Sequence, residues 1–141
     1  ASAASVDNEA IRVRSTGCTT DCGSDDTYRI RARETTAFIP RFNNSATQVT
    51  VVLLQNREST PVSGHIWFWS APGSLLASRA FTLSPRASLT LLTTNVVGLS
   101  GQSGSLTVTH DGPYDALAGK AVALEPATGF AFDSPMQSRT R

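Results

Sequence analysis

Short segments in which apolar and polar residues alternate are the feature that most constrains this fold. They recur along the chain with turn-forming residues between them, for example at residues 9–15, 27–35, 64–70 and 104–111. A period of two places every second side chain on one face of a β-strand, whereas an amphipathic helix needs a period of 3.6. About nine or ten such segments, spaced roughly 8–12 residues apart, predict an all-β antiparallel sandwich, immunoglobulin-like in the broad sense, with about 8–10 short strands.

The amino-acid composition agrees with an all-β chain. Serine and threonine each account for 17 of the 141 residues, and 16% of the residues are charged. Threonine favours strands and serine favours turns, while both compete with the hydrogen bonds of a helix. We expect an N-terminal extension over residues 1–16, one sandwich domain over 17–135 and a C-terminal tail over 136–141.

Several classes of function find no support in the sequence. The net charge of +1 gives no field that would attract nucleic acid, and no apolar stretch is long enough to span a membrane. The motifs G-x-S-x-G and H-E-x-x-H are absent, and His65 and His110 lie outside any catalytic pattern. We therefore expect a protein that is not an enzyme and has no cofactor or metal.

The two cysteines, Cys18 and Cys22, lie four positions apart in a glycine-flanked segment. They are too few for a zinc site, so we predict a short disulfide, which implies an oxidising compartment. Nearby Asp21, Asp25 and Asp26 either form a solvated turn or bind calcium, although the EF-hand spacing is absent. The small residues at positions 1–7 resemble what remains after a secretory signal is cleaved, or they mark a chosen boundary. Together these features predict a secreted protein.

Two aromatic residues, Trp67 and Trp69, fall on the same face of one predicted strand, opposite Ile66 and Phe68. Their spacing of about 7 Å would let them stack on sugar rings. The alternative is that one packs in the core and the other lies at a sheet edge or a subunit contact. They are candidate residues for binding a glycan.

Arginines alternate along another predicted strand at Arg29, Arg31 and Arg33. This row would bind acidic polysaccharide or a partner's carboxylates, or it would form a solvated face with cross-strand acidic partners. Asn43 begins the sequence Asn-Asn-Ser, which matches the pattern for N-linked glycosylation.

Three stretches carry a resemblance to known proteins: "CTTDCGSDDTYRIRARETT", "PRFNNSATQVTVVLLQN" and "GKAVALEPATGFAFDSP". Over residues 18–135 the chain resembles uncharacterised β-sandwich modules of bacterial secreted and cell-surface proteins. The resemblance implies a sandwich fold and an extracellular location, and it names no active site.

The first functional hypothesis is a structural subunit that assembles with itself. Ile11 and Val13 alternate with polar residues near the N-terminus, so this segment would add as a strand to a neighbouring subunit and build a filament. The alternative is an accessory module that binds carbohydrate or another ligand through the tryptophans and arginines.

Overall fold

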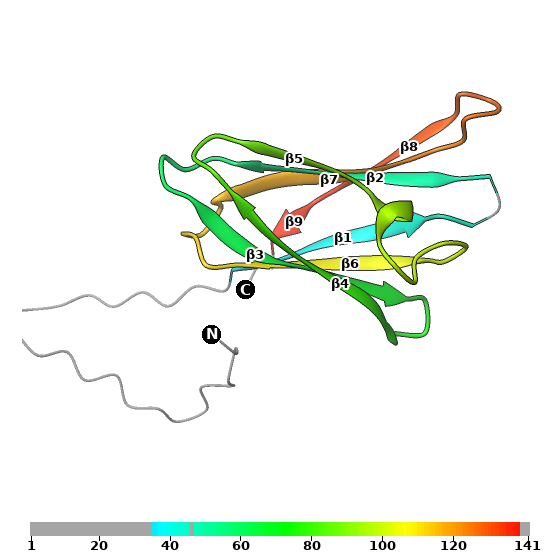
Figure 1. Cartoon of the computed structure of the whole chain (residues 1–141), viewed down its shortest axis with the longest axis horizontal. Coiled ribbons are helices and arrows are strands. Elements are labelled where there is room, and N and C mark those ends of the chain that lie inside the picture. Colours follow the sequence, from blue (N-terminus) through cyan, green and yellow to red (C-terminus); the bar gives the residue numbers. More distant parts are fainter. Residues whose placement is uncertain (1–34, 46, 139–141) are drawn as a thin grey trace, which may run out of the picture. The chain divides into compact units, whose positions relative to one another are not determined.

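The computed structural model describes residues 35–45 and 47–138, which form two packed β-sheets (Figure 1). The described chain holds nine strands and one short 3-10 helix. Their bounds are β1 Thr36–Asn43, β2 Val49–Asn56, β3 Val62–Ser70, β4 Leu75–Leu83, β5 Ser88–Leu92, η1 Thr93–Asn95, β6 Ser103–His110, β7 Leu117–Leu124, β8 Ala131–Pro135 and β9 Gln137–Ser138.

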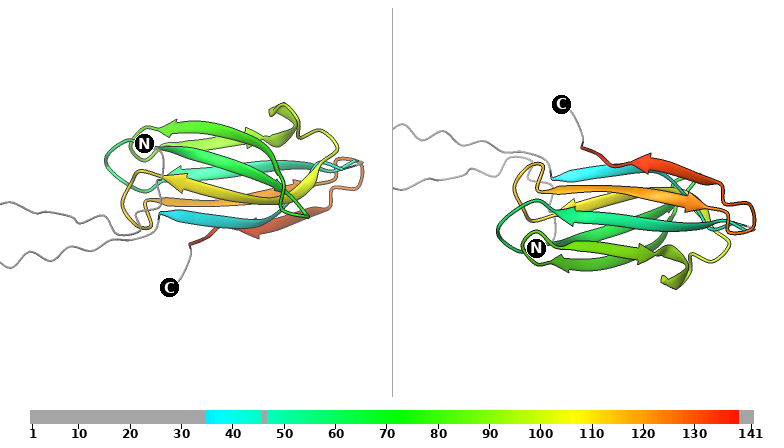
Figure 2. Two further views of the ribbon diagram at one scale, coloured as in Figure 1. Left: turned by 90° about the horizontal axis from the view of Figure 1, so that it is seen from below. Right: turned by 90° about the horizontal axis from the view of Figure 1, so that it is seen from above.

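The strands lie in two antiparallel layers, which Figure 2 shows from two sides. Sheet A has five strands in the order β4-β3-β6-β1-β9, and sheet B has four in the order β5-β2-β7-β8. Every pairing between neighbouring strands is antiparallel. The prediction of an antiparallel β-sandwich is therefore confirmed.

The hydrophobic core lies between the two sheets and is supplied by alternate residues of the strands. Phe42 and Phe68 meet edge to face, with ring centroids 5.6 Å apart. Burying side chains of this size stabilises the fold by about 1.5–3 kcal/mol each. The largest fully buried apolar side chains are Ile39, Phe42, Val52, Leu54, Val62, Ile66, Phe68, Leu99, Leu106 and Val108.

Strand β3 shows the alternation that the sequence predicts. Ile66 and Phe68 are fully buried in the core, while Trp67 and Trp69 lie on the outer face of sheet A. The apolar run at residues 47–56 predicts a strong, mostly buried strand, and β2 forms there with Gln55 as its one exposed residue. Its residues Thr50, Val52, Leu54 and Asn56 face the core, whereas the alternate residues between them are half-buried or exposed on the outer face of sheet B.

Strand β1 contains Pro40, which cannot donate a hydrogen bond and so predicts an edge or a bend. The pairing of β1 with β6 shifts register between Ile39 and Phe42, and β9 pairs only with Ala37 and Phe38. Proline therefore lies at a bulge and beyond the end of β9. The pairing of β9 also means that residues 137–138, expected in the C-terminal tail, continue sheet A.

Candidate functional sites

Many of the candidate residues lie outside the described part of the chain. These are Cys18 and Cys22 of the predicted disulfide, the arginines Arg29, Arg31 and Arg33, the aspartates Asp21, Asp25 and Asp26, and the assembly residues Ile11 and Val13. Trp67, Trp69 and Asn43 are described: the two tryptophans share one face of β3, and Asn43 lies at the end of β1.

An aromatic row crosses the outer face of sheet A along β3. The indole N–H of Trp67 donates to Thr109 Oγ1 at 3.2 Å, and that of Trp69 donates to Thr107 Oγ1 at 3.0 Å. Both tryptophans therefore lean over β6 in fixed orientations. The ring of His65 stacks on Trp67, with centroids 5.4 Å apart and planes 27° apart, and so covers one face of that indole.

A surface hollow of about 370 Å³ lies near the Trp69 end of this row. Gly104 and Ser105 of β6 line it, and Ser105 is the register partner of Trp69. Pro40 and Arg41 of β1 line its other side. The aromatic row and the hollow therefore adjoin on sheet A.

Asn43 lies at the end of β1, where its side chain closes a local turn. Its Oδ1 accepts hydrogen bonds from the N–H of Ser45 at 2.9 Å and the hydroxyl of Ser45 at 2.5 Å. Its Nδ2 donates to Gln48 Oε1 at 2.6 Å. The half-buried amide is thus engaged within the protein. Glycosylation of Asn43 remains a prediction.

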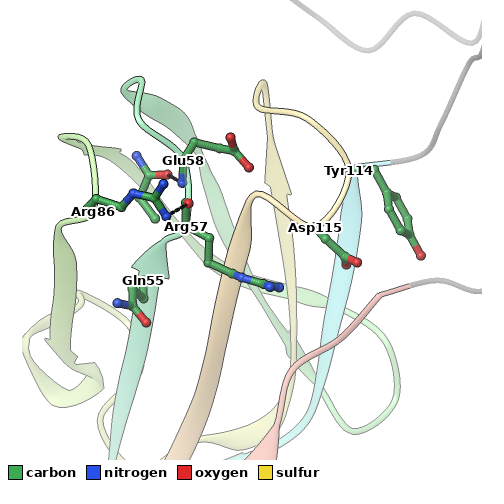
Figure 3. Close-up of a pocket in the computed structure, with 7 residues that line it drawn as sticks. Gln55, Arg57, Glu58, Arg86, Tyr114 and Asp115 are labelled. Atoms are coloured by element: carbon green, nitrogen blue, oxygen red, sulfur yellow. Dashed lines mark hydrogen bonds between the residues drawn. The ribbon is translucent and has the colours of Figure 1, made fainter.

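A polar pocket of about 450 Å³ opens at the end of the sandwich where β2–β3, β4–β5 and β6–β7 are connected (Figure 3). We call this the pocket end. The lining residues are Gln55, Asn56, Arg57, Glu58, Arg86, Tyr114 and Asp115. In Figure 3 the Arg57 side chain extends between Gln55 and Asp115, and Arg86 lies across from Asp115 beside Glu58.

The three connections around this pocket are braced to one another. The backbone N–H of Arg57 donates to the carbonyl of Ala116 at 2.8 Å, and that of Arg86 donates to the carbonyl of Glu58 at 3.1 Å. The guanidinium of Arg86 also donates to the carbonyl of Arg57. The pocket is therefore formed by backbone that is held in place, and its polar side chains converge from three connections.

Two turns at the pocket carry charged residues in the left-handed backbone region. Arg86 has φ 60° and Asp115 has φ 62°. In each turn the N–H of the following alanine donates to a carbonyl three residues earlier, that of Ser84 or Pro113, at 3.1 Å. A positive φ at the third position of such a turn favours glycine or asparagine. Aspartate tolerates this conformation, whereas arginine adopts it rarely.

His110, at the end of β6, lies beside a small cavity of about 10 Å³ that Tyr114 and Met136 also line. Burial lowers the pKa of His110 from its ordinary value of 6.5, while the charge of Asp111 and a backbone hydrogen bond at Gly112 act in the opposite direction. Its Nδ1 is buried without a hydrogen-bond partner among the described residues.

The outer edge of β4 is a third surface of interest. Strand β4 ends sheet A, and no described strand pairs with this edge. The strand has nine residues, and Arg79 is its one charged residue. Leu75, the first residue of β4, is 51% exposed. Val97, in the connection between η1 and β6, is 94% exposed, and its neighbour Gly98 lies close to Leu76 of β4.

Within residues 35–45 and 47–138, no three or more His, Cys, Asp or Glu side chains group closely enough to hold a metal ion. In the same part of the chain no helix is both long and apolar enough to cross a membrane.

Comparison with known proteins identifies the fold alone. No protein-family model matches the chain, and no curated protein matches it either. The chain is similar in structure to the solved protein "Thermotoga maritima 1070", with a TM-score of 0.64. The match covers 75% of this chain and 95% of that one, at 11% sequence identity. It is a likeness between β-sandwich folds.

The sequence did not predict the polar pocket as a site. Each of its connections is recognisable as a turn, from "NREST", "SPR" and "DGPYD". Arg57 and Arg86 are far apart in the chain, however, and only the strand order of the two sheets brings their connections together.

Proposed function

We propose that the protein is a secreted, non-catalytic β-sandwich subunit that assembles with itself by adding a strand to the outer edge of β4. The observation that carries the proposal is the length of this edge and its near lack of charge. An edge strand presents unpaired N–H and C=O groups, and proteins that avoid edge pairing protect such strands with charges, prolines or bulges. Strand β4 has a single arginine along its nine residues and a register shift only near its first residues.

Exposed apolar side chains near the start of β4 support a protein partner. Leu75 is half exposed and Val97 is almost fully exposed. A Cβ atom at Gly98 would lie 3.6 Å from the carbonyl oxygen of Leu76, so the Val97–Gly98 connection lies against this part of the strand. Burying these side chains in a subunit contact would stabilise the assembly further, beyond the backbone hydrogen bonds of the added strand.

The donor in this proposal is the segment 9–15, which lies outside the described residues. Its sequence alternates Ile11 and Val13 with Arg12 and Arg14. Added antiparallel to β4 with the apolar residues toward the core, it would place the arginines on the outer face of sheet A beside Ala80, which is exposed there opposite His65. Head-to-tail donation gives an open fibre, because the contact does not close on itself.

The experiment compares the full chain with a chain lacking residues 1–16, by negative-stain electron microscopy and sedimentation. We expect filaments or higher oligomers from the full chain and monomers from the truncated chain. Monomers from both, over a wide range of concentration, would overturn the proposal.

A matched pair of substitutions at Ala80 tests the register of the added strand. Ala80→Lys brings like charge against the donor arginines and should weaken assembly about threefold, whereas Ala80→Glu should strengthen it by a similar factor. Equal effects of the two variants would show that the donor segment does not lie beside Ala80.

The aromatic row favours a second candidate function, an accessory module that binds polysaccharide. Trp69 is the better platform, because His65 covers one face of Trp67, and the hollow beside Ser105 gives a chain of sugars room to continue. Retention on insoluble polysaccharides such as cellulose or chitin should fall more with Trp69→Ala than with Trp67→Ala. Phe130→Ala, at an aromatic residue 78% exposed on the β7–β8 connection, is the control. Equal retention of all variants would contradict this function.

A further inference from the structure

We propose that the polar pocket at the pocket end of the sandwich binds a uronic acid residue of an acidic saccharide, with its carboxylate held by Arg57 and Arg86. The proposal concerns a different part of the molecule from the β4 edge and the aromatic row, and it holds whether or not the protein assembles.

The two guanidinium groups are available to an anion. Among the described residues the one close ion pair joins Lys120 and Asp133 at 2.7 Å, and neither residue lines the pocket. Neither Glu58 nor Asp115 therefore neutralises Arg57 or Arg86 at salt-bridge distance. The Arg57 side chain has no described hydrogen-bond partner, and Arg86 uses one donor on the carbonyl of Arg57. Guanidinium groups match the planar geometry of a carboxylate and bind it through paired hydrogen bonds.

The rest of the lining favours a saccharide over a simple anion. Gln55, Glu58 and Asp115 supply amide and carboxylate oxygens that accept hydrogen bonds from hydroxyl groups. The pocket volume of about 450 Å³ is in the usual range for sites that bind small molecules. A uronic acid carries both a carboxylate and several hydroxyl groups, so it satisfies both kinds of partner.

The backbone at Arg86 and Asp115 gives an independent reason to assign a role to these side chains. Both residues have a positive φ at a turn position that glycine would occupy with less strain. The other described residues with a positive φ are all glycines: Gly73, Gly98, Gly101, Gly104 and Gly129. Charged side chains thus replace glycine only at the two turns that line the pocket, and strained positions of this kind cluster at ligand sites.

Titration of the full-length ¹⁵N-labelled protein with digalacturonate, followed by NMR, tests the proposal. The neutral control is digalactose, which has hydroxymethyl groups in place of the carboxylates. We expect shift changes centred on Arg57, Glu58, Arg86 and Asp115, affinity at least tenfold higher for the acidic sugar, and weaker binding in 1 M salt because the charges are screened.

Variants at the pocket complete the test. Arg57→Gln and Arg86→Gly should each lower the affinity for digalacturonate at least tenfold, and the glycine variant suits the turn that it occupies. Lys120→Gln, at an exposed cation of β7 that pairs with Asp133, should leave binding unchanged. Equal binding of digalactose, no binding of digalacturonate at about 10 mM, or full binding by both pocket variants would overturn the proposal. Equally tight binding of an acetylated peptide with a free C-terminal carboxylate would overturn the assignment to a saccharide.

Discussion

The two ends of the sandwich are each organised by one buried asparagine, but the groups around these residues differ. At the end opposite the pocket, Asn44 accepts from the N–H of Thr50 at 3.0 Å and the hydroxyl of Thr93 at 2.7 Å, and donates to the carbonyl of Leu99 at 3.0 Å. The network consists of amides, hydroxyls and backbone groups that satisfy one another.

At the pocket end, Asn56 is also fully buried, and its side chain joins the β2–β3 and β4–β5 connections. Its Nδ2 lies 2.8 Å from the carbonyl oxygen of Thr60, 3.2 Å from that of Leu83 and 3.0 Å from that of Ser84. Its Oδ1 accepts from the N–H of Glu58 at 2.8 Å. Around this asparagine, however, charged side chains reach the pocket without closing ion pairs. At the end around Asn44 the polar groups bond to one another within the described chain, whereas the pocket end presents charged groups suited to a ligand.

The largest expected effect comes from breaking the network opposite the pocket. Asn44→Ala removes three buried hydrogen bonds, so the free energy of unfolding should fall by about 3 kcal/mol. The N–H of Thr50 loses this acceptor, while the hydroxyl of Thr93 and the carbonyl of Leu99 each keep a second partner. Binding at the pocket should not change in the folded protein. Urea denaturation measures the loss, and Asn95→Ala, at an exposed residue of η1, is the control. A loss below about 1 kcal/mol would show that solvent replaces the Asn44 contacts.

A smaller loss of stability is expected at the pocket end, together with a loss of binding. Asn56→Ala removes the side chain that joins the connections, and the freed carbonyls lie nearer solvent, so we expect about 2 kcal/mol. Because the same connections carry Glu58 and Arg86, affinity for digalacturonate should fall as well. Gln55→Ala, at an exposed neighbour, should cost less than 0.5 kcal/mol by comparison, on the order expected for surface substitutions. Unchanged affinity of Asn56→Ala for digalacturonate would show that Asn56 does not position the residues that bind the ligand.

Substitutions at the turns sharpen the comparison between the ends. Arg86→Gly should give a protein about 1 kcal/mol more stable than Arg86→Ala, because both lose the guanidinium contact and only glycine relieves the positive φ. Opposite the pocket, Gly101 has φ 71°, so Gly101→Ala should lower stability by about 1 kcal/mol. Thermal unfolding of the three variants checks this. Equal stability of the two Arg86 variants would mean that its turn carries no strain.

The smallest effect is a dependence of stability on pH that arises at the pocket end. The pKa of His110 is lower in the folded protein than its unfolded value of 6.5, so the unfolded chain binds the proton more readily. Stability should therefore fall as pH drops below about 6.5 and continue to fall until the folded protein also takes up the proton. Thermal unfolding of wild type and His110→Gln at several pH values should show a smaller decline in the variant. Parallel curves would contradict a role for this histidine.

Much of the fold follows from the sequence because alternation reports directly on local geometry. The two faces of β3 are predicted correctly from Ile66, Phe68 and the two tryptophans, and Pro40 marks the bulge in β1. The run of apolar residues in β2 predicted a mostly buried strand. Such a run does not reveal that nothing in the described chain covers the outer face of sheet B.

The candidate site was harder to predict because it depends on contacts between distant segments. Arg57, Arg86 and Asp115 meet only after the strands have taken their order in the two sheets. The positive φ of Arg86 is hidden as well, since "SPR" fits several turn types and arginine is an unusual residue at that position. Asn44 and Asn56 look like ordinary polar loop residues, although the fold buries both.

The pairing of β1 with β9 determines how the sandwich would respond to mechanical force. Ala37 lies opposite Ser138, so the first and last described strands meet at the pocket end, and tension on them would act at one place (Figure 1). Force applied there would open the hydrogen-bonded pairs one after another, first the two of β9 and then those of β1 with β6. Strands loaded in this way yield at lower force than strands sheared along their whole length. A fibre built by strand donation would instead load each subunit between its N-terminal segment and its β4 edge, and such a load would not pull β9 away from β1.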